Sequence, residues 1–384
     1  RINVMNCCIN CFIDEEIINI IKCDKTIGKC DFCGKENVNV CNIEKKELRE
    51  NFQQILEVYQ FSPSVTDSEK KEKSLFEILA NEWDIFKLDY VKIKDFLINL
   101  FPDKDKSYFE RPVNLQHYTK EHYSILGNYE WEDFVKEIKE KNRFHTKIIN
   151  TDLLSGIFKR ISKDYGQGKY FYRGRLCSNK DFYAVEEMGA PPLSKAGAGR
   201  ANSQGIRCLY LADSPETTTF EVRAGLYDDI CIGTFKARKP IRVVNLALLD
   251  KISPFRDIDI VSLAINLPHL KKIAEEISRP LKRGDSPLDY LPTQYISDFI
   301  KSLGFDGIEY ESTMRKNGIN LAVFDPDIFE CIRVEKYEIE SIEYKAALLS
   351  EKPKENRVQS SHSKNLKKIL EKTLDETLEK DLTI

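Results

Sequence analysis

Seven of the eleven cysteines are crowded between Cys7 and Cys41, and this crowding is the strongest constraint on how the chain can fold. Four of them follow the spacing C-x2-C, eighteen residues, C-x2-C, and these are Cys8, Cys11, Cys30 and Cys33. Two thiolates from one tight turn can occupy two corners of a tetrahedron, and Gly34 lets backbone amides turn toward the sulfurs. The spacing predicts a zinc ribbon over residues 1–43, with a short helix over Asp14–Lys22.

The remaining cysteines leave two points open. Cys7, Cys23 and Cys41 are spare within this module, and one of them could replace a zinc ligand. A set of reduced, buried thiols is the alternative to a metal site. We favour structural zinc, because paired Cys-x2-Cys units in a long, charged, unexported chain are more typical of metal sites than of disulfides.

Length and charge limit the remaining organisation. A single core stops growing at roughly 250 to 300 residues, so a chain of 384 residues is expected to form two folded units with a small appendage. The 59 basic and 62 acidic residues give a net charge of -3, which provides no global positive field for nucleic acid or a membrane surface. No apolar run approaches the roughly 18 to 20 residues that span a bilayer, and no signal peptide is evident. We therefore expect a cytoplasmic protein.

Residues 44–150 have the periodicity of an all-α domain. Glu47–Gln60 carries apolar side chains at three- and four-residue intervals, and Trp131–Lys141 repeats the pattern. One catalytic alternative lies here, because Arg111 and His117 match the Arg-x4-6-His spacing of HEPN-type ribonucleases. Pro112 follows the arginine, and proline is poorly tolerated inside the helix that would hold both side chains. A packing or sensing role is therefore favoured.

Residues 151–346 are rich in β-branched and aromatic runs. After a helix expected over Asp152–Lys163, we place strands at Lys169–Tyr172, Cys208–Leu211, Ile230–Lys236, Ile241–Asn245, Gly307–Glu311, Asn320–Phe324 and Glu330–Val334. Further helices are expected at Pro215–Arg223, Ile258–Ile277 and Thr293–Leu303. The regular alternation and glycine fingerprint of a doubly wound nucleotide fold are missing from the sequence, so the pattern predicts an α+β chain with a mixed α/β domain.

Two polar groups in this domain have the chemistry of an anion site. Arg173 closes an apolar strand, and arginine makes paired bonds to phosphate oxygens while keeping its charge. The glycine-rich loop Gly197–Ile206 contains Arg200 and Asn202 and can wrap a phosphate or a ribose. A salt-bridge arginine and an ordinary surface loop are the structural alternatives.

A third group pairs a carboxylate with a hydroxyl. Glu221 lies one and a half to two turns into a helix that Ser214 can cap and Pro215 can start. Ser312 closes another apolar strand before a turn rich in glycine and asparagine. The alternatives here are a surface acid and a turn-forming serine.

The order of these groups resembles the RES domain, which is named for its arginine, glutamate and serine. The matching pieces are FYRGR, GRAN-x-x-GI, LYLA, TTTFEVR and YESTMRKNGINLAVFDP, from Tyr172 to about Val334. The resemblance implies an ADP-ribosyltransferase-like fold that binds NAD+ as its substrate and degrades it, often as a toxin restrained by a partner. The N-terminal ribbon and helices also look like a region sometimes fused to RES domains.

The resemblance also implies a role for each site residue. Arg173, Glu221 and Ser312 are the expected catalytic residues, with Glu221 stabilising the positive charge that develops on ribose as nicotinamide leaves. The expected NAD+ contacts are Arg173, Arg200, Asn202 and Tyr210. The arginines are expected on the pyrophosphate and Tyr210 against nicotinamide, whose position Ser312 fixes.

Several functional alternatives stay open. The chain departs from small RES toxins in Gly174 and in a long helical insertion at 246–306. The same pocket could therefore carry out hydrolysis, phosphorolysis or protein ADP-ribosylation. A non-catalytic NAD+ or nucleotide sensor and a HEPN-type nuclease are the alternatives of other classes.

The tail over residues 347–384 is charged and expected to be helical. Leu366, Leu370, Leu374, Leu378 and Leu382 recur every fourth residue and form one apolar ridge. Such a ridge either docks on the body of the protein or associates with a partner, including a second copy of the chain. A solvated, partly frayed helix is the alternative.

Overall fold

The computed structural model describes residues 5–62, 73–83, 85–115, 120–177, 181–255, 259–280 and 286–343. The chain divides into two compact units, Arg1–Glu340 and Ser341–Ile384, and all described elements belong to the first. His117 and the leucine ridge of the tail lie outside the described residues. No described helix is long and apolar enough to cross a membrane.

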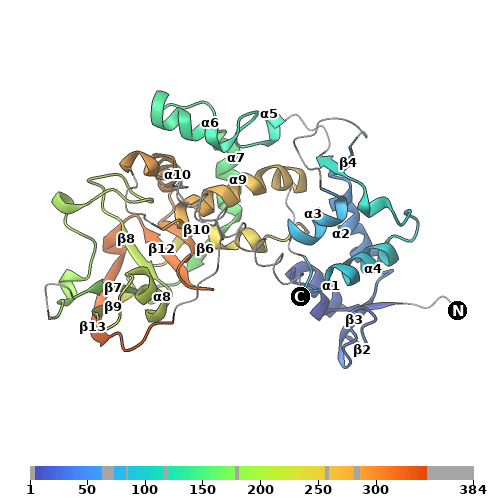
Figure 1. The fold of residues 1–384 in the computed structure, drawn as a ribbon, viewed down its shortest axis with the longest axis horizontal. Helices are drawn as coiled ribbons and strands as arrows, with labels where there is room; N and C mark the ends of the chain where they lie inside the picture. The colour runs from blue at the N-terminus through green and yellow to red at the C-terminus, as the bar shows by residue number, and fades with distance from the viewer. Residues whose placement is uncertain are drawn as a thin grey trace, which may run out of the picture. The chain divides into compact units, whose positions relative to one another are not determined.

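The N-terminal module combines a small sheet with one helix (Figure 1). Strands β1 (Asn6–Cys8), β3 (Val38–Asn42) and β2 (Thr26–Gly28) pair antiparallel in that order. Helix α1 (Glu15–Cys23) matches the helix expected between the cysteine pairs. It begins there because the Asp14 carboxylate accepts the amide hydrogens of Glu16 and Ile17.

The following region is helical apart from one two-stranded sheet. Its helices are α2 (Lys46–Leu56), α3 (Leu75–Asn81), α4 (Tyr90–Leu100), α5 (Lys120–Tyr123), α6 (Trp131–Lys136) with a π-helical turn at Glu137–Lys141, and α7 (Thr151–Arg160). Strands β4 (Tyr59–Phe61) and β5 (Val113–Leu115) pair antiparallel. The helix expected to reach Gln60 therefore ends at Leu56, since the backbone after it bonds to β5.

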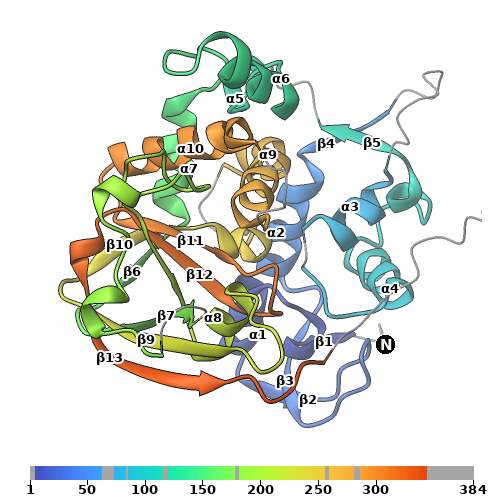
Figure 2. The ribbon, with the colours of Figure 1, turned by 60° about the vertical axis from the view of Figure 1, so that its left-hand side comes forward.

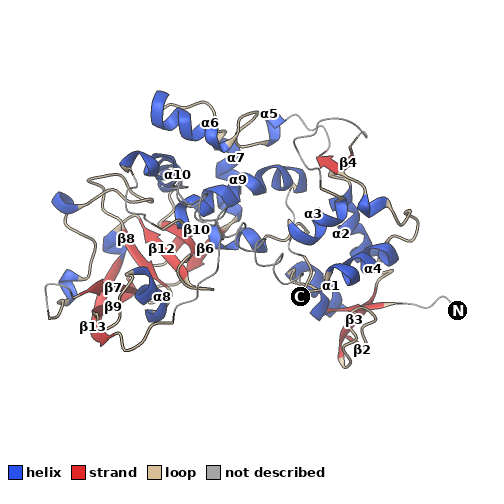
Figure 3. Cartoon of the chain, in the orientation of Figure 1, coloured by secondary structure: helices blue, strands red, loops and turns tan. Residues whose placement is uncertain are grey.

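A large mixed sheet lies in the rest of the described chain, with its strands in red in Figure 3. The order is β13 (Phe329–Glu338), β9 (Asp229–Ala237), β7 (Tyr170–Leu176), β8 (Leu209–Ala212), β12 (Ile319–Val323), β11 (Gly307–Glu311), β10 (Ile241–Asn245) and β6 (Ser162–Tyr165). Strands β10 and β11 pair in parallel, and the other neighbours are antiparallel. The predicted α+β class is confirmed.

Strand β6 corrects one sequence prediction. The helix expected over Asp152–Lys163 ends at Arg160, and Ser162–Tyr165 instead pairs with β10 at the edge of the sheet. The Lys163 ammonium reaches the buried Glu309 carboxylate at 2.8 Å, and the Tyr165 hydroxyl donates to the same carboxylate. These long-range bonds override the local helical periodicity.

Three helices accompany the sheet: α8 (Pro215–Glu221), α9 (Ile260–Ser278) and α10 (Leu291–Ser302). Short 3-10 turns lie at Ile9–Cys11, Tyr108–Glu110, Val185–Glu187, Leu193–Lys195, Leu246–Lys251, Pro287–Tyr290 and Pro326–Ile328. The insertion predicted between Asn245 and Gly307 contains α9 and α10, whose packing beside the sheet is visible in Figure 2.

Helix α9 belongs to two hydrophobic cores. Near its start, Leu263 lies in the core of the N-terminal module and its helices, where Phe255 also packs on Phe52 with ring centroids 5.2 Å apart. Farther along, Leu270 and Ile273 lie in the second core with α7 and α10. Both ends of this one helix are therefore fixed by burial.

Candidate active site

A cavity of about 440 Å³ opens where β7 and β8 separate. Strand β7 pairs with β9 along its whole length but meets β8 at Tyr172 and Ala212. The lining comes from β7, the 197–202 loop, β8, α8, Tyr310, Asn320 and residues 277–280 at the end of α9. This volume lies within the roughly 300 to 1,000 Å³ of small-molecule sites.

The Glu221 carboxylate is held by two side chains at one wall of this cavity. Its Oε1 atom accepts a hydrogen bond from Ser312 Oγ at 2.5 Å and another from Asn320 Nδ2 at 2.8 Å. Glu221 is the last residue of α8, Ser312 follows β11, and Asn320 lies on β12. Three elements thus converge on a single carboxylate oxygen.

Local bonds fix the turn that carries Ser312. Its hydroxyl oxygen accepts the amide hydrogens of Met314 and Arg315, each at 3.2 Å. The Arg315 guanidinium donates to Oγ of Ser214, the N-cap residue of α8, at 3.0 Å and to Oγ1 of Thr217, in the first turn of α8, at 2.9 Å. The turn and the helix are therefore tied together, which supports the geometry of the Ser312–Glu221 contact.

Arg173 places a positive charge at the same cavity. Its Nη1 donates to the Gly189 carbonyl at 3.0 Å, and no described carboxylate forms an ion pair with it. Burial, followed by repulsion from Arg175, lowers the pKa of Arg173 to about 10, so the group is still charged at neutral pH. These contacts do not support the salt-bridge alternative among the described residues.

The 197–206 loop is organised by Asn202 and Tyr210. The Asn202 amide donates to the carbonyls of Gly197 and Ile206, both at 2.9 Å, and also to Ser203. Its oxygen accepts the Tyr210 hydroxyl at 2.7 Å. Both amide hydrogens of Asn202 are thus used within the loop, so its side chain shapes the loop in this structure, and Tyr210 both lines the cavity and anchors the loop.

Residues 175–345 match the family model described as RES domain. The chain contains a RES domain. The matched range includes Arg200, Asn202, Tyr210, Glu221 and Ser312, and it begins two residues after Arg173.

One similar solved structure is titled "Crystal structure of the M.tuberculosis MbcT-MbcA toxin-antitoxin complex". The similarity covers 48% of this chain and 92% of that chain, with 14% sequence identity and a TM-score of 0.29. No curated protein matches the chain.

Two arginines close the RES cavity from the side of the insertion. Arg200 is 7% exposed, donates to the Glu276 carbonyl at 3.2 Å and lies over the Tyr290 ring at 5.1 Å. Arg279, just after α9, pairs with the Glu276 carboxylate at 3.7 Å. Both arginines also line a neighbouring cavity of about 600 Å³. The insertion therefore contributes directly to the wall of this cavity.

Sequence reasoning missed three residues of this site. Asn320 could have been identified from the sequence, because an asparagine inside an apolar strand is expected to be buried and a buried amide needs a hydrogen-bond partner. Gly174 was seen only as a departure from small RES toxins, yet a Cβ there would meet Val222 at 3.0 Å and Thr218 at 3.1 Å. Arg279 carries no local signal, since only the path of α9 brings it to the cavity.

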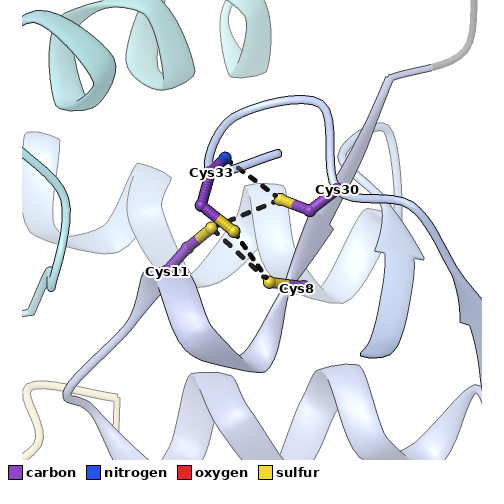
Figure 4. A group of neighbouring side chains, drawn as sticks. All are labelled: Cys8, Cys11, Cys30 and Cys33. Carbon is purple, nitrogen blue, oxygen red and sulfur yellow. Dashed lines mark hydrogen bonds between the residues drawn. The ribbon is translucent and has the colours of Figure 1, made fainter. Parts of the chain in front are cut away.

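The four cysteines of the predicted zinc ribbon lie outside the RES match and form one compact group (Figure 4). Their sulfurs lie within 4.8 Å of one another, with 3.8 Å between Cys8 and Cys11 and 3.4 Å for both Cys8–Cys33 and Cys11–Cys30. Zinc–sulfur bonds of about 2.3 Å in a tetrahedron place sulfurs about 3.8 Å apart. The donor set therefore fits zinc.

The spare cysteines lie apart from this group. Cys7 and Cys41 face each other across β1 and β3, with their sulfurs 3.7 Å apart, and Cys23 is exposed.

Proposed function

We propose that the RES domain cleaves the nicotinamide–ribose bond of NAD+. The observation that carries this proposal is the Glu221 carboxylate, fixed by Ser312 and Asn320 in a cavity that also holds Arg173. Departure of nicotinamide builds positive charge on the ribose, as in the oxocarbenium-like transition states of glycoside hydrolysis. A fixed carboxylate beside that charge lowers the barrier electrostatically.

The cationic side chains of the cavity suit the pyrophosphate of NAD+. Arg173 has no described carboxylate partner, and Arg200 and Arg279 lie at the same cavity. Charged hydrogen bonds to phosphate are roughly twice as strong as neutral ones. We assign pyrophosphate binding to Arg173 and Arg200, nicotinamide packing to Tyr210, and support of the loop to Asn202.

The first step is common to three outcomes. Water, phosphate or a protein side chain can each capture the ribose cation, giving hydrolysis, phosphorolysis or ADP-ribosylation of a target. Loss of NAD+ would make the protein a growth-inhibiting toxin or defence effector, restrained by a neutralising protein partner. Zinc, held by Cys8, Cys11, Cys30 and Cys33, is structural in this proposal, because four thiolates close a tetrahedral site.

The test is incubation of the purified protein with NAD+, with and without phosphate, followed by identification of the products. Free ADP-ribose, a phosphorylated sugar product and label on protein distinguish the three outcomes. Binding of NAD+ without any turnover would instead identify a sensor.

The same assay on Glu221→Gln tests the central residue. The amide keeps the size of the side chain but removes the charge, so NAD+ consumption is expected to fall by about 10² to 10³. Glu216→Gln is the matched control, since Glu216 is an exposed acid on the same helix. Equal activity of the two folded variants would refute the role of Glu221.

A further inference from the structure

Asn320 is a polar side chain inside an otherwise apolar strand. It is 7% exposed on β12, followed directly by the buried residues Leu321, Ala322 and Val323. Burying an amide costs free energy unless it is hydrogen-bonded. The amide of Asn320 donates to Glu221 Oε1 at 2.8 Å, so its place in the core is linked to that carboxylate.

The sheet fixes the position of Asn320 from both sides. Its backbone lies opposite Tyr310 on β11 and opposite Ala212 on β8. Ser312 follows two residues after Tyr310, so the two donors to Glu221 come from adjacent chain segments. Asn320 therefore has little freedom to move away from the carboxylate.

Both donors reach the same oxygen of Glu221. Ser312 and Asn320 bond to Oε1, and among the described residues no hydrogen bond reaches Oε2. Two bonds at one oxygen restrict rotation of the carboxylate and of the long side chain behind it. Oε2 is thus the oxygen that remains available to a ligand in the cavity that Glu221 lines.

We infer that Asn320 is a positioning residue that, together with Ser312, orients Glu221 so that Oε2 faces the reacting ribose. This inference rests on the proposed NAD+ cleavage. It gives the two donors one shared task, since either bond alone leaves the carboxylate freer to turn. Glu221 then supplies the negative charge at the reaction centre, and the neutral side chains of Ser312 and Asn320 set the orientation of its carboxylate.

The test compares kcat and KM for NAD+ in Asn320→Asp and Asn320→Ala. Aspartate keeps the shape of asparagine but replaces its donor with an acceptor beside Glu221. In both variants kcat is expected to fall about 10- to 100-fold, while KM changes less than about threefold, because the arginine contacts remain. Asn51→Asp on α2, which also loses one amide hydrogen bond, is the control and is expected to keep the wild-type kcat.

A double variant separates positioning from general structural support. Ser312→Ala combined with Asn320→Ala is expected to lose little more activity than the worse single variant, because both residues serve one oxygen. Losses that multiply would overturn the shared role. Equal changes of kcat and KM that follow the fall in melting temperature would indicate a structural residue and overturn the inference.

The outcome for the wild-type protein distinguishes the two levels of the proposal. If wild type consumes NAD+ and Glu221→Gln does not, an unchanged kcat in both Asn320 variants overturns the inference alone. If wild type leaves NAD+ intact under all conditions, the proposed function fails and this inference fails with it.

Discussion

At the scale of single residues, the cavity combines one fixed carboxylate with cations of differing freedom. Arg200 is held by a carbonyl and an aromatic ring, whereas Arg173 makes one hydrogen bond within the described part of the chain, to a backbone carbonyl. Burial lowers the pKa of Arg173 to about 10, because removal from water destabilises the charged guanidinium. A bound anion would offset this loss of solvation. Arg173 is therefore the cation whose loss should affect ligand binding most.

We predict that Arg173→Ala raises KM for NAD+ by about 10- to 100-fold, since a hydrogen bond to a charged group contributes about 1.5 to 3 kcal/mol. Arg173→Lys should recover part of this loss, because lysine restores the charge but not the paired geometry. Steady-state kinetics provide the measurement. Arg175→Ala, two residues along β7, is the control, and a matching change in KM there would count against a specific role for Arg173.

The sequence was sufficient to predict the site residues that carry a charged or hydroxyl group at the end of an apolar element. Glu221, Ser312 and Arg173 were predicted as one site from their order. In the structure Glu221 and Arg173 line one cavity, and Ser312 bonds to the Glu221 carboxylate. Their proposed roles remain predictions. Asn320 and Arg279 were not predicted, because their importance depends on strand register and on where α9 ends.

At the scale of elements, strand positions were easier to predict than the partners of each strand. Strands β10 and β11 have the bounds expected from their β-branched runs. Strand β6 was not predicted, because it is stabilised by long-range bonds to β10 and to Glu309 and not by its local sequence. The contact of α8 with β7 likewise depends on Gly174, whose amide donates to Thr218 Oγ1 at 2.6 Å.

We predict that Gly174→Ala destabilises the protein by about 1 to 3 kcal/mol, the usual cost of overpacking. A Cβ would meet Val222 at 3.0 Å and Thr218 at 3.1 Å, which forces α8 and its Glu221 away from β7. Denaturant unfolding and NAD+ turnover should both decline. Gly166→Ala is the matched control, because a Cβ there meets nothing within 4 Å. Similar stability for the two variants would argue against close α8–β7 packing.

At the scale of the whole molecule, the cysteine group and the RES cavity are separate sites within one compact unit. The four cysteines lie in the N-terminal module, and the lining of the cavity comes from the sheet region and the insertion. Zinc should therefore contribute to stability without taking part in the reaction.

We predict one zinc ion per chain, measured by elemental analysis of protein purified without chelator. Cys30→Ser combined with Cys33→Ser should abolish zinc binding and lower the melting temperature, because folding free energy is coupled to metal binding. Cys23→Ser should retain the metal, since Cys23 is exposed and outside the group. NAD+ cleavage by the protein that stays folded should continue after chelation, and its immediate loss would contradict a purely structural role.

Helix α9 has a consequence for anyone who wishes to transplant the RES domain into another protein. A fragment that starts near residue 151 would keep Phe255, Ile260 and Leu263 but lose the N-terminal side chains that cover them. Such a fragment would expose an apolar, aggregation-prone stripe on α9, the helix that ends beside Arg279. A soluble graft would need either the entire N-terminal module or polar replacements along that stripe.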